Sequence, residues 1–178
     1  MTTHIALLRG INVGGNTLRM ERLRVLFAEL GLADARTYAQ SGNVLFAAAR
    51  PPVELAALIE ARLARETRLP VSVLVRTPAQ LERILAANPF LKEPGIDARK
   101  LHVTFLSGRP SKPGLTALGG VKSGADRWQA AGMEVYLHCP DCYGRSKLNN
   151  TAIERLLAIR ATTRNWTTAR ALYDMSLE

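Results

Sequence analysis

Four short stretches of the sequence carry more glycine and hydrogen-bonding side chains than folding alone requires. They read RGINVGG at residues 9–15, QSGN at 40–43, GRSK at 144–147 and TRNW at 163–166. Binding residues concentrate in the loops and element ends that a rigid scaffold positions. The candidate ligand-binding set joins the donor side chains of these stretches to two loop glycines: Arg9, Asn12, Gly14, Gly15, Gln40, Ser41, Asn43, Arg145, Lys147, Arg164 and Asn165.

The residue types in this set predict the chemistry of the ligand. The four stretches contain no Asp, Glu or His, and arginine and lysine only donate hydrogen bonds. Such donors suit phosphate or carboxylate, which arginine holds with two parallel hydrogen bonds. The set offers neither the carboxylate ligands of hard metal ions nor an obvious general base. We therefore expect a small anionic, phosphate-bearing ligand, with a nucleotide as one candidate. We expect no metal and no cofactor, and leave open whether the protein is an enzyme.

The glycine-rich stretch is compatible with anion binding and also with a purely structural role. Gly10, Gly14 and Gly15 precede a helix expected near Arg19, so backbone N–H groups could converge on an anion at the helix N-terminus. No Lys-Ser or Lys-Thr follows the glycines, so the stretch is not a P-loop, and G-x-G-x-x-G is absent as well. The alternative is a tight turn whose glycines take positive φ.

The later stretches have structural alternatives of the same kind. Ser146 and Asn165 could cap helices, while Arg145 and Arg164 could pair with carbonyl or carboxylate groups. Trp166, in the first turn of an expected helix, is more typical of a core residue than of a base-stacking platform.

Cysteine and histidine offer little further chemistry. The pair Cys139-x-x-Cys142 could be half of a zinc site or a redox pair, but a zinc site needs two more ligands and a redox pair needs a helix start that lowers a thiol pKa. We interpret both cysteines as thiols without a role. His4, His102 and His138 are spread along expected strands, without metal-ligand spacing.

The elements that would position the four stretches follow the order of a ferredoxin-like fold. Residues 5–9, 36–40, 43–47 and 71–75 are expected strands, with helices over 19–30 and from the proline pair at 51–52 onward. This βαββαβ order is the split βαβ arrangement. Strands 5–8 and 71–75 are apolar on both faces except at Ser72, which indicates that both faces are covered, by the other half or by a second chain.

The second half repeats this order, so we predict an α+β fold of two tandem ferredoxin-like halves with a C-terminal helix. A connecting helix begins at Thr77 and a linker follows it. The repeat then has strands over 101–106, 127–130, 133–138 and 161–163, helices over 112–118 and 147–159, and a final helix over 166–177. Aligning Gly42 with Gly132 places Phe46 against Tyr136. The expected domains are residues 1–76 and 99–178, joined by 77–98, with the ligand in a groove between the halves.

Composition narrows the class of protein without naming a partner. The 178 residues are 47% hydrophobic and 22% charged, which excludes a disordered or fibrous chain. The net charge of +9 is spread over both halves without a basic run, so charge alone does not identify a nucleic-acid partner. Neither a signal peptide nor a membrane-spanning run is apparent, and two cysteines fit a reducing compartment. We expect a cytoplasmic protein.

The motifs LLRGINVGG, TYAQSGNVLF, YGRSKLNN and ATTRNWTT resemble a widespread bacterial family of uncharacterised proteins, a domain of unknown function. The resemblance covers essentially the whole chain with its motifs in the same order. It implies duplicated ferredoxin-like halves and brings no activity, substrate or catalytic residue. Cys139-Pro-Asp-Cys142 is not a fixed part of the family pattern, which argues against a family-wide role for the two cysteines.

Three functions stay open at this point. The first is a binding protein for a small phosphorylated ligand, or an enzyme that stabilises such a ligand electrostatically. The second is a structural scaffold or homodimer whose motifs hold loops in place. The third is a nucleic-acid-binding module that uses loops, since the expected central strands offer only Phe46 for base stacking. No membrane partner is expected.

Overall fold

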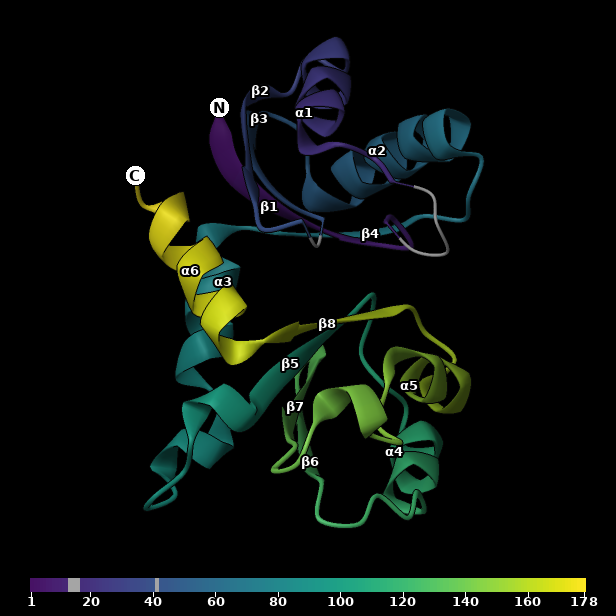
Figure 1. Cartoon of the computed structure of the whole chain (residues 1–178), viewed down its shortest axis with the longest axis vertical. Helices are drawn as coiled ribbons and strands as arrows, with labels where there is room; N and C mark the ends of the chain where they lie inside the picture. Colours follow the sequence, from purple (N-terminus) through teal and green to yellow (C-terminus); the bar gives the residue numbers. More distant parts are fainter. Residues whose placement is uncertain (13–16, 41) are drawn as a thin grey trace. The chain divides into compact units, whose positions relative to one another are not determined.

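The computed structural model describes residues 1–12, 17–40 and 42–178. These residues form two compact units, one of residues 1–82 with 172–178 and one of residues 83–171. Figure 1 shows that each unit contains one sheet with helices beside it. Gly14, Gly15 and Ser41 of the candidate set lie outside the described residues.

The first unit is an antiparallel sheet covered by two helices. Its strands are β1 (Thr2–Arg9), β2 (Ala33–Tyr38), β3 (Asn43–Ala48) and β4 (Ser72–Arg76), in the order β2-β3-β1-β4. Helices α1 (Met20–Glu29) and α2 (Pro52–Thr67) pack on one face through a core that includes Leu23, Phe27, Phe46 and Ile59. The opposite face of β1 is buried as well, with Ile5 and Leu7 at 0% and 1% exposure. Both faces of this strand are therefore buried, as its unbroken apolar run predicted.

The second unit repeats this topology. Its strands are β5 (Leu101–Leu106), β6 (Arg127–Ala131), β7 (Glu134–His138) and β8 (Ala161–Asn165), in the order β6-β7-β5-β8, with α4 (Lys112–Gly119) and α5 (Asn150–Leu157) on one face. Helix α3 (Pro78–Ala86) follows β4, and α6 (Trp166–Ser176) follows β8. The predicted fold of two ferredoxin-like halves with a C-terminal helix is confirmed. A helix follows the last strand of each half, α3 after the first half and α6 after the second.

The start of α5 and the linker after α3 differ from the sequence-based expectation. Helix α5 begins at Asn150 rather than near residue 147, because the Ser146 hydroxyl accepts a hydrogen bond from the Leu148 N–H (3.0 Å) in a turn before the helix. Asn149, not Ser146, caps α5 by accepting from the Ala152 N–H at 3.0 Å. The stretch after α3 contains two short 3-10 helices, η1 (Pro89–Lys92) and η2 (Ala98–Lys100).

The strand registers correct the alignment of the two halves. Ile5 pairs with Leu45 and Arg76, and Val103 pairs with Tyr136 and Arg164. Leu45, rather than Phe46, therefore corresponds to Tyr136. The Leu8 N–H donates to Gly42 O (2.8 Å) as the Leu106 N–H donates to Met133 O (2.9 Å), so Gly42 corresponds to Met133. The alignment on Gly132 was wrong because the two hairpin turns differ in length.

No helix in the described ranges is long and apolar enough to cross a membrane.

Candidate anion-binding site

The structure sorts the four candidate stretches into two pairs, one in each unit. In the first unit, three connections lie at the same end of the strands, because β1 runs antiparallel to β3 and β4. They are the end of β1, the turn between β2 and β3, and the chain between α2 and β4. In the second unit, the ends of β7 and β8 lie at the same end of the strands, because both run antiparallel to β5. The described parts of the stretches at 9–15 and 40–43 therefore lie near each other, and the stretches at 144–147 and 163–166 lie toward the same end of the second sheet.

Asn12 joins the first two stretches. Its backbone adopts φ +55°, a left-handed conformation that asparagine tolerates better than most residues. Its side-chain amide donates to Gln40 O at 3.2 Å, and its side-chain oxygen accepts from the Leu18 N–H at 2.6 Å. Asn12 thus ties the loop after β1 both to the β2–β3 turn and to the entry of α1.

Other residues of these two stretches have structural roles. Gly10 has φ +90°, and a Cβ there would lie 2.6 Å from Pro70 O, so the position admits only glycine without a shift. Asn43 is fully buried and donates from its side-chain amide to Tyr38 O at 3.1 Å, which closes the β2–β3 turn. Arg9 is half-buried at the end of β1, where it pairs with Ser72 of β4.

The candidates of the second unit divide into exposed and buried cations. Arg145 and Lys147 are exposed in the segment before α5. Arg164 is 9% exposed and donates to Thr162 Oγ1 and Thr163 O, both at 2.9 Å. Burial lowers the pKa of Arg164 to about 10. Asn165 accepts from the Thr168 N–H at 2.7 Å and so caps α6, one of the structural roles considered for it.

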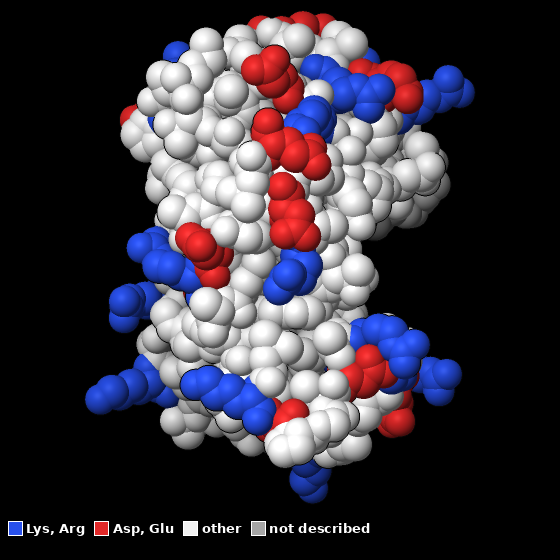
Figure 2. Space-filling model, turned by 90° about the vertical axis from the view of Figure 1, so that its left-hand side faces the viewer, with Lys and Arg blue, Asp and Glu red and all other residues white. Residues whose placement is uncertain are grey.

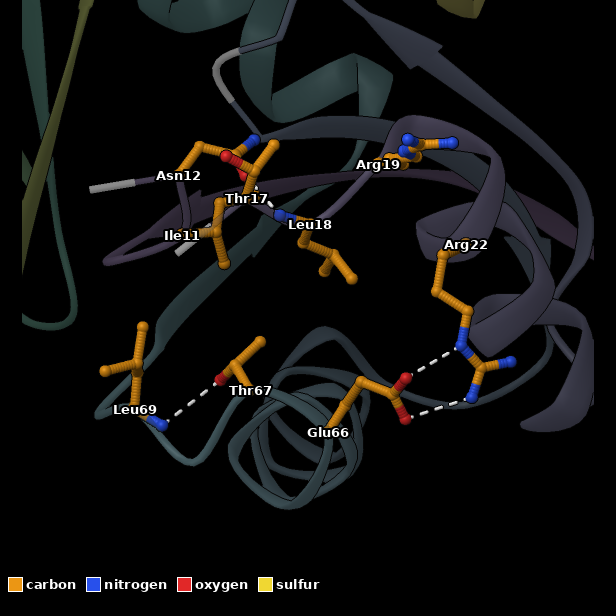
Figure 3. Close-up of a pocket in the computed structure, with 9 residues that line it drawn as sticks. All are labelled: Ile11, Asn12, Thr17, Leu18, Arg19, Arg22, Glu66, Thr67 and Leu69. Atoms are coloured by element: carbon orange, nitrogen blue, oxygen red, sulfur yellow. Dashed lines mark hydrogen bonds and ion pairs between the residues drawn. The ribbon is translucent and has the colours of Figure 1, made fainter. Parts of the chain in front are cut away.

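A cavity of about 400 Å³ lies beside the loop after β1 (Figure 3). It is bounded by the entry of α1 on one side and the end of α2 on the other. Its lining consists of Ile11, Asn12, Thr17, Leu18, Arg19, Arg22, Glu66, Thr67 and Leu69. A smaller hollow of about 170 Å³ shares Asn12, Thr17, Leu18 and Arg19 and extends to Gln40. Of the candidate set, the structure therefore brings Asn12 and Gln40 to these hollows.

The N-terminus of α1 opens at this cavity, and the described residues provide no side-chain cap for it. Arg19, the residue before the helix, has an extended backbone (φ −64°, ψ 143°) and provides no side-chain cap. The first N–H groups of a helix have no partner within the helix, and they carry its positive dipole end. The described part of the chain holds no hydrogen-bond or ion-pair partner for the exposed Arg19 side chain. This end of α1 therefore offers both N–H donors and a cation.

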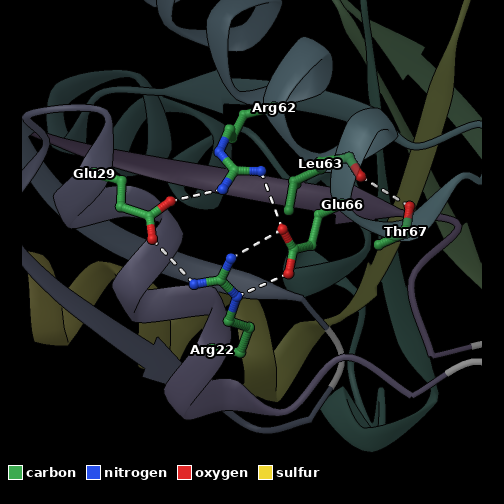
Figure 4. Close-up of polar contacts among 6 residues, drawn as sticks. All are labelled: Arg22, Glu29, Arg62, Leu63, Glu66 and Thr67. Carbon is green, nitrogen blue, oxygen red and sulfur yellow. Dashed lines mark hydrogen bonds and ion pairs between the residues drawn. The ribbon is translucent and has the colours of Figure 1, made fainter.

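The second arginine of the cavity belongs to a network of ion pairs between α1 and α2 (Figure 4). Arg22 binds Glu66 through Nε (2.7 Å) and a terminal nitrogen (3.0 Å), and also binds Glu29 at 3.0 Å. Arg62 binds Glu29 at 2.6 Å and Glu66 at 3.1 Å. We call these four residues the α1–α2 tetrad. Its two positive and two negative charges balance.

The tetrad determines the protonation state of the cavity carboxylate. Hydrogen bonds from Arg22 and Arg62 outweigh desolvation and lower the pKa of Glu66 to about 2. Glu66 therefore stays ionised at neutral pH, with its charge offset by two arginines. Arg19 is the cavity cation whose charge no described carboxylate offsets.

Sequence reasoning missed Thr17, Arg19 and the tetrad. Arg19 lies directly before an expected helix, and Arg62 and Glu66 have the i,i+4 spacing of helical ion pairs. Those two signals were available in the sequence. The pairing of Arg22 with Glu66 was not, because it joins residues 44 positions apart.

The two cysteines and the basic side chains do not form a further site among the described residues. Cys139 is buried and Cys142 is exposed, and burial raises the pKa of the Cys139 thiol to about 11, the opposite of an activated nucleophile. Figure 2 shows basic side chains singly or next to acidic ones on the face drawn, without a continuous basic stripe there.

Comparisons with known proteins identify a family and a fold. A family model described as protein of unknown function (DUF1697) matches residues 1–136. A conserved bacterial protein from Streptococcus pneumoniae has a similar solved structure, with a TM-score of 0.79 and 21% identity over 100% of this chain and 99% of that one. No curated protein matches the sequence. At this identity the solved structure supports the fold alone. Because the family model spans most of the chain, the protein belongs to the DUF1697 family of unknown function.

Proposed function

We propose that this protein binds a small phosphate-bearing anion in the cavity between the entry of α1 and the end of α2. One observation carries the proposal. The N-terminus of α1, for which the described residues provide no side-chain cap, and Arg19, which has no partner among those residues, open on the same cavity of about 400 Å³. The sequence had suggested a groove between the two halves, whereas the proposal now concerns a cavity within the first unit.

The lining gives each part of such a ligand a partner. Backbone N–H groups at the start of α1 and the Arg19 guanidinium would bind the phosphate oxygens, with the exposed Thr17 hydroxyl beside them. Ile11, Leu18 and Leu69 supply apolar contact for the rest of the ligand. Asn12 is already committed to Gln40 and Leu18, so its role is to position the loop.

The state of Glu66 favours binding over proton-transfer chemistry. A general base works best with a pKa near the working pH. Glu66 has a pKa of about 2 and is engaged by two arginines, so it is a poor proton acceptor. We therefore propose a binding protein and retain electrostatic catalysis as a variant of the same proposal. We also propose a cytoplasmic location, which agrees with both cysteines being free thiols.

The experiment is a thermal-shift screen followed by calorimetry at low ionic strength. The probes are inorganic phosphate, mononucleotides, sugar phosphates, dicarboxylates and short oligonucleotides. A ligand at about 100 times its Kd adds about 2.7 kcal/mol to the stability of the folded state. We expect a phosphate-bearing small molecule to raise the Tm, and Arg19→Gln to remove most of that rise.

The matched control is Arg50→Gln. Arg50 is exposed and lies two residues before α2, close to a helix N-terminus but outside the cavity lining. We expect binding in this variant to equal that of the wild type. Equal weakening by both substitutions would show that net charge, not the cavity, attracts the ligand. A shift with oligonucleotides alone, or with no probe, would overturn the proposal.

A further inference from the structure

The two sheets have four outer edges, and the structure protects three of them. An unpaired edge strand offers a row of N–H and C=O groups to any other chain, so natural proteins block such edges with charges, bulges or covering segments. The outer strands here are β4 and β2 in the first sheet, and β8 and β6 in the second.

A glutamate blocks the outer edge of β4 and of β8. Glu60 of α2 accepts a hydrogen bond from the Val73 N–H at 2.8 Å. Glu154 of α5 accepts from the Ala161 N–H at 2.9 Å. Val73 pairs with Leu8 and Ala161 with Leu106, which are corresponding positions in the two halves. In each half, a glutamate of a helix that packs on the sheet thus accepts a hydrogen bond from a strand N–H that an additional strand would need.

The edge of β2 is interrupted by its backbone and by the end of the chain. The pairing of β2 with β3 shifts register between Ala33 and Arg36, and Asp34 has φ +53°. Arg36 binds the Glu178 carboxylate and Met175 O, both at 2.7 Å. A bulged strand tied to the end of α6 is a poor template for a further strand.

The edge of β6 has no such protection. Residues Arg127–Ala131 pair with Glu134–His138 of β7 in an unbroken register. Beyond this pairing, the backbone of β6 has no hydrogen-bond partner in the described part of the chain. The strand contains neither lysine nor proline. It is therefore regular and open along its whole length.

We propose that β6 pairs with the β6 strand of a second copy of this chain, antiparallel and centred on Gln129. The sequence Arg-Trp-Gln-Ala-Ala is self-complementary in that register. Trp128 lies across from Ala130 of the copy and Arg127 across from Ala131, so each large side chain faces a methyl group. Gln129 meets its own copy on the two-fold axis, where two side-chain amides can each donate and accept.

The backbone groups of β6 suit this register. Ala131 and Glu134 flank a two-residue turn in which Gly132 has φ +64°. The residues flanking such a turn exchange hydrogen bonds with each other, and the next residue along the strand points its N–H and C=O outward. Ala130 and Trp128 are the outward-pointing residues. In the proposed pair they lie opposite each other and exchange N–H···O bonds across the axis.

Charge and packing also favour the second copy. The Arg127 guanidinium binds the Glu93 carboxylate at 2.7 and 3.0 Å and lies 5.1 Å from the centre of the Phe90 ring. Its charge is therefore offset, and the antiparallel register keeps the two copies of Arg127 at opposite ends of the pair. Trp128 is half-buried against the second hydrophobic core, which holds the strand in place.

The first test measures oligomeric state by sedimentation velocity over a wide concentration range. Five residues a side bury less than the roughly 1,200 Å² of a standard interface, so we expect a weak, concentration-dependent dimer. Gln129→Lys places like charges on the axis, and Ala130→Pro removes an outward N–H while leaving the β7 pairing intact. Both should give monomers with cooperative melting. Ala86→Lys, at an exposed position on α3, should dimerise like the wild type.

The second test fixes the register by disulfide trapping in a Cys142→Ser background. Opposed residues of a non-hydrogen-bonded antiparallel pair have Cα atoms about 4.5 Å apart, within disulfide range. Gln129→Cys should therefore form a covalent dimer on mild oxidation. Ala131→Cys, which faces Arg127 of the copy, should not. A monomer at every concentration, or equal cross-linking of the two variants, would overturn the proposal.

Discussion

The two halves of this protein share one topology and differ in how their helices meet and how their first strand connects to a helix. In the first half, residues 10–19 connect β1 to α1, and in the second half the shorter stretch 107–111 connects β5 to α4. The α1–α2 tetrad bridges the first helix pair. In the second pair, a Cβ at Gly114 would lie 3.2 Å from Leu156 O, so α4 and α5 approach closely. The cavity lies where the helices are bridged by charges.

A contact that occurs at corresponding positions of both halves is best explained by the fold that the halves share, because their other surroundings differ. Glu60 and Glu154 accept from corresponding strand N–H groups. Arg76 donates to Val75 O at 3.2 Å, as Arg164 donates to Thr163 O at 2.9 Å. Features present in one half only, such as Arg19 and its cavity, are better candidates for function. The corresponding contact of Arg76 favours a structural role for Arg164, while its place in the predicted ligand set stays a prediction.

The largest effect is expected at the glycine that follows the first strand of each half. Gly10 and Gly108 are corresponding positions by strand register. A Cβ at Gly10 would strike Pro70 O and occupy a backbone at φ +90°, whereas Gly108 has nothing within 4 Å. Gly10→Ala should lower the free energy of unfolding by about 3 kcal/mol, from strain and overpacking together. Gly108→Ala should change it by less than about 1 kcal/mol.

Urea unfolding of the two variants measures this contrast. Equal losses at Gly10 and Gly108 would mean that the long loop after β1 adapts as easily as the short one after β5. The difference between the halves would then not lie in this connection.

An intermediate effect is expected at the duplicated edge glutamates. Glu60→Ala and Glu154→Ala each leave a strand N–H without its acceptor, which costs about 1–3 kcal/mol. Glutamine at either position keeps an accepting oxygen and should restore most of the loss. Thermal unfolding of the four variants tests this expectation. A large loss in one half only would show that the glutamates are not equivalent.

The smallest effect is expected from acid titration of the α1–α2 tetrad, because its side chains are partly exposed. Arginine hydrogen bonds lower the pKa of Glu66 from 4.5 to about 2 and also lower the pKa of Glu29. The ion pairs therefore stabilise the fold above pH 4.5, and this stabilisation is lost as the pH falls toward 2. The urea midpoints of wild type and Glu66→Gln should differ at neutral pH and converge in acid.

Glu82→Gln is the matched control for this titration, since Glu82 is exposed and no partner for it is described. The small difference between its urea midpoint and that of the wild type should not depend on pH. If the urea midpoints of wild type and Glu66→Gln still differ at pH 2, the Glu66 side chain stabilises the fold by packing rather than by charge.

Much of the fold was predictable from local patterns. The strand at 101–106 was predicted with its observed bounds, and α6 was predicted to within one residue of each end. Errors arose where a side chain competes with the backbone, as at Ser146, whose hydroxyl delays the start of α5. The hairpin alignment failed because glycine marks a turn without specifying its length.

The candidate site was predictable only in part. Asn12 and Gln40 do meet at one end of the first sheet. Arg164 and Asn165 have the donor chemistry of a binding site. In the structure, however, the buried Arg164 donates to a threonine hydroxyl and a strand carbonyl, and Asn165 caps α6. Residue type records what a side chain can donate, and only the fold determines which acceptor it reaches.

By itself, the sequence determined the fold class, the order of the elements and the two-half plan, because apolar periodicity and turn residues act over a few neighbouring positions. The tertiary structure alone decided which charges are balanced. Arg22 finds Glu66 across the space between two helices, and Arg19 is left facing the cavity. Such pairing depends on contacts between distant parts of the chain, which local pattern does not encode.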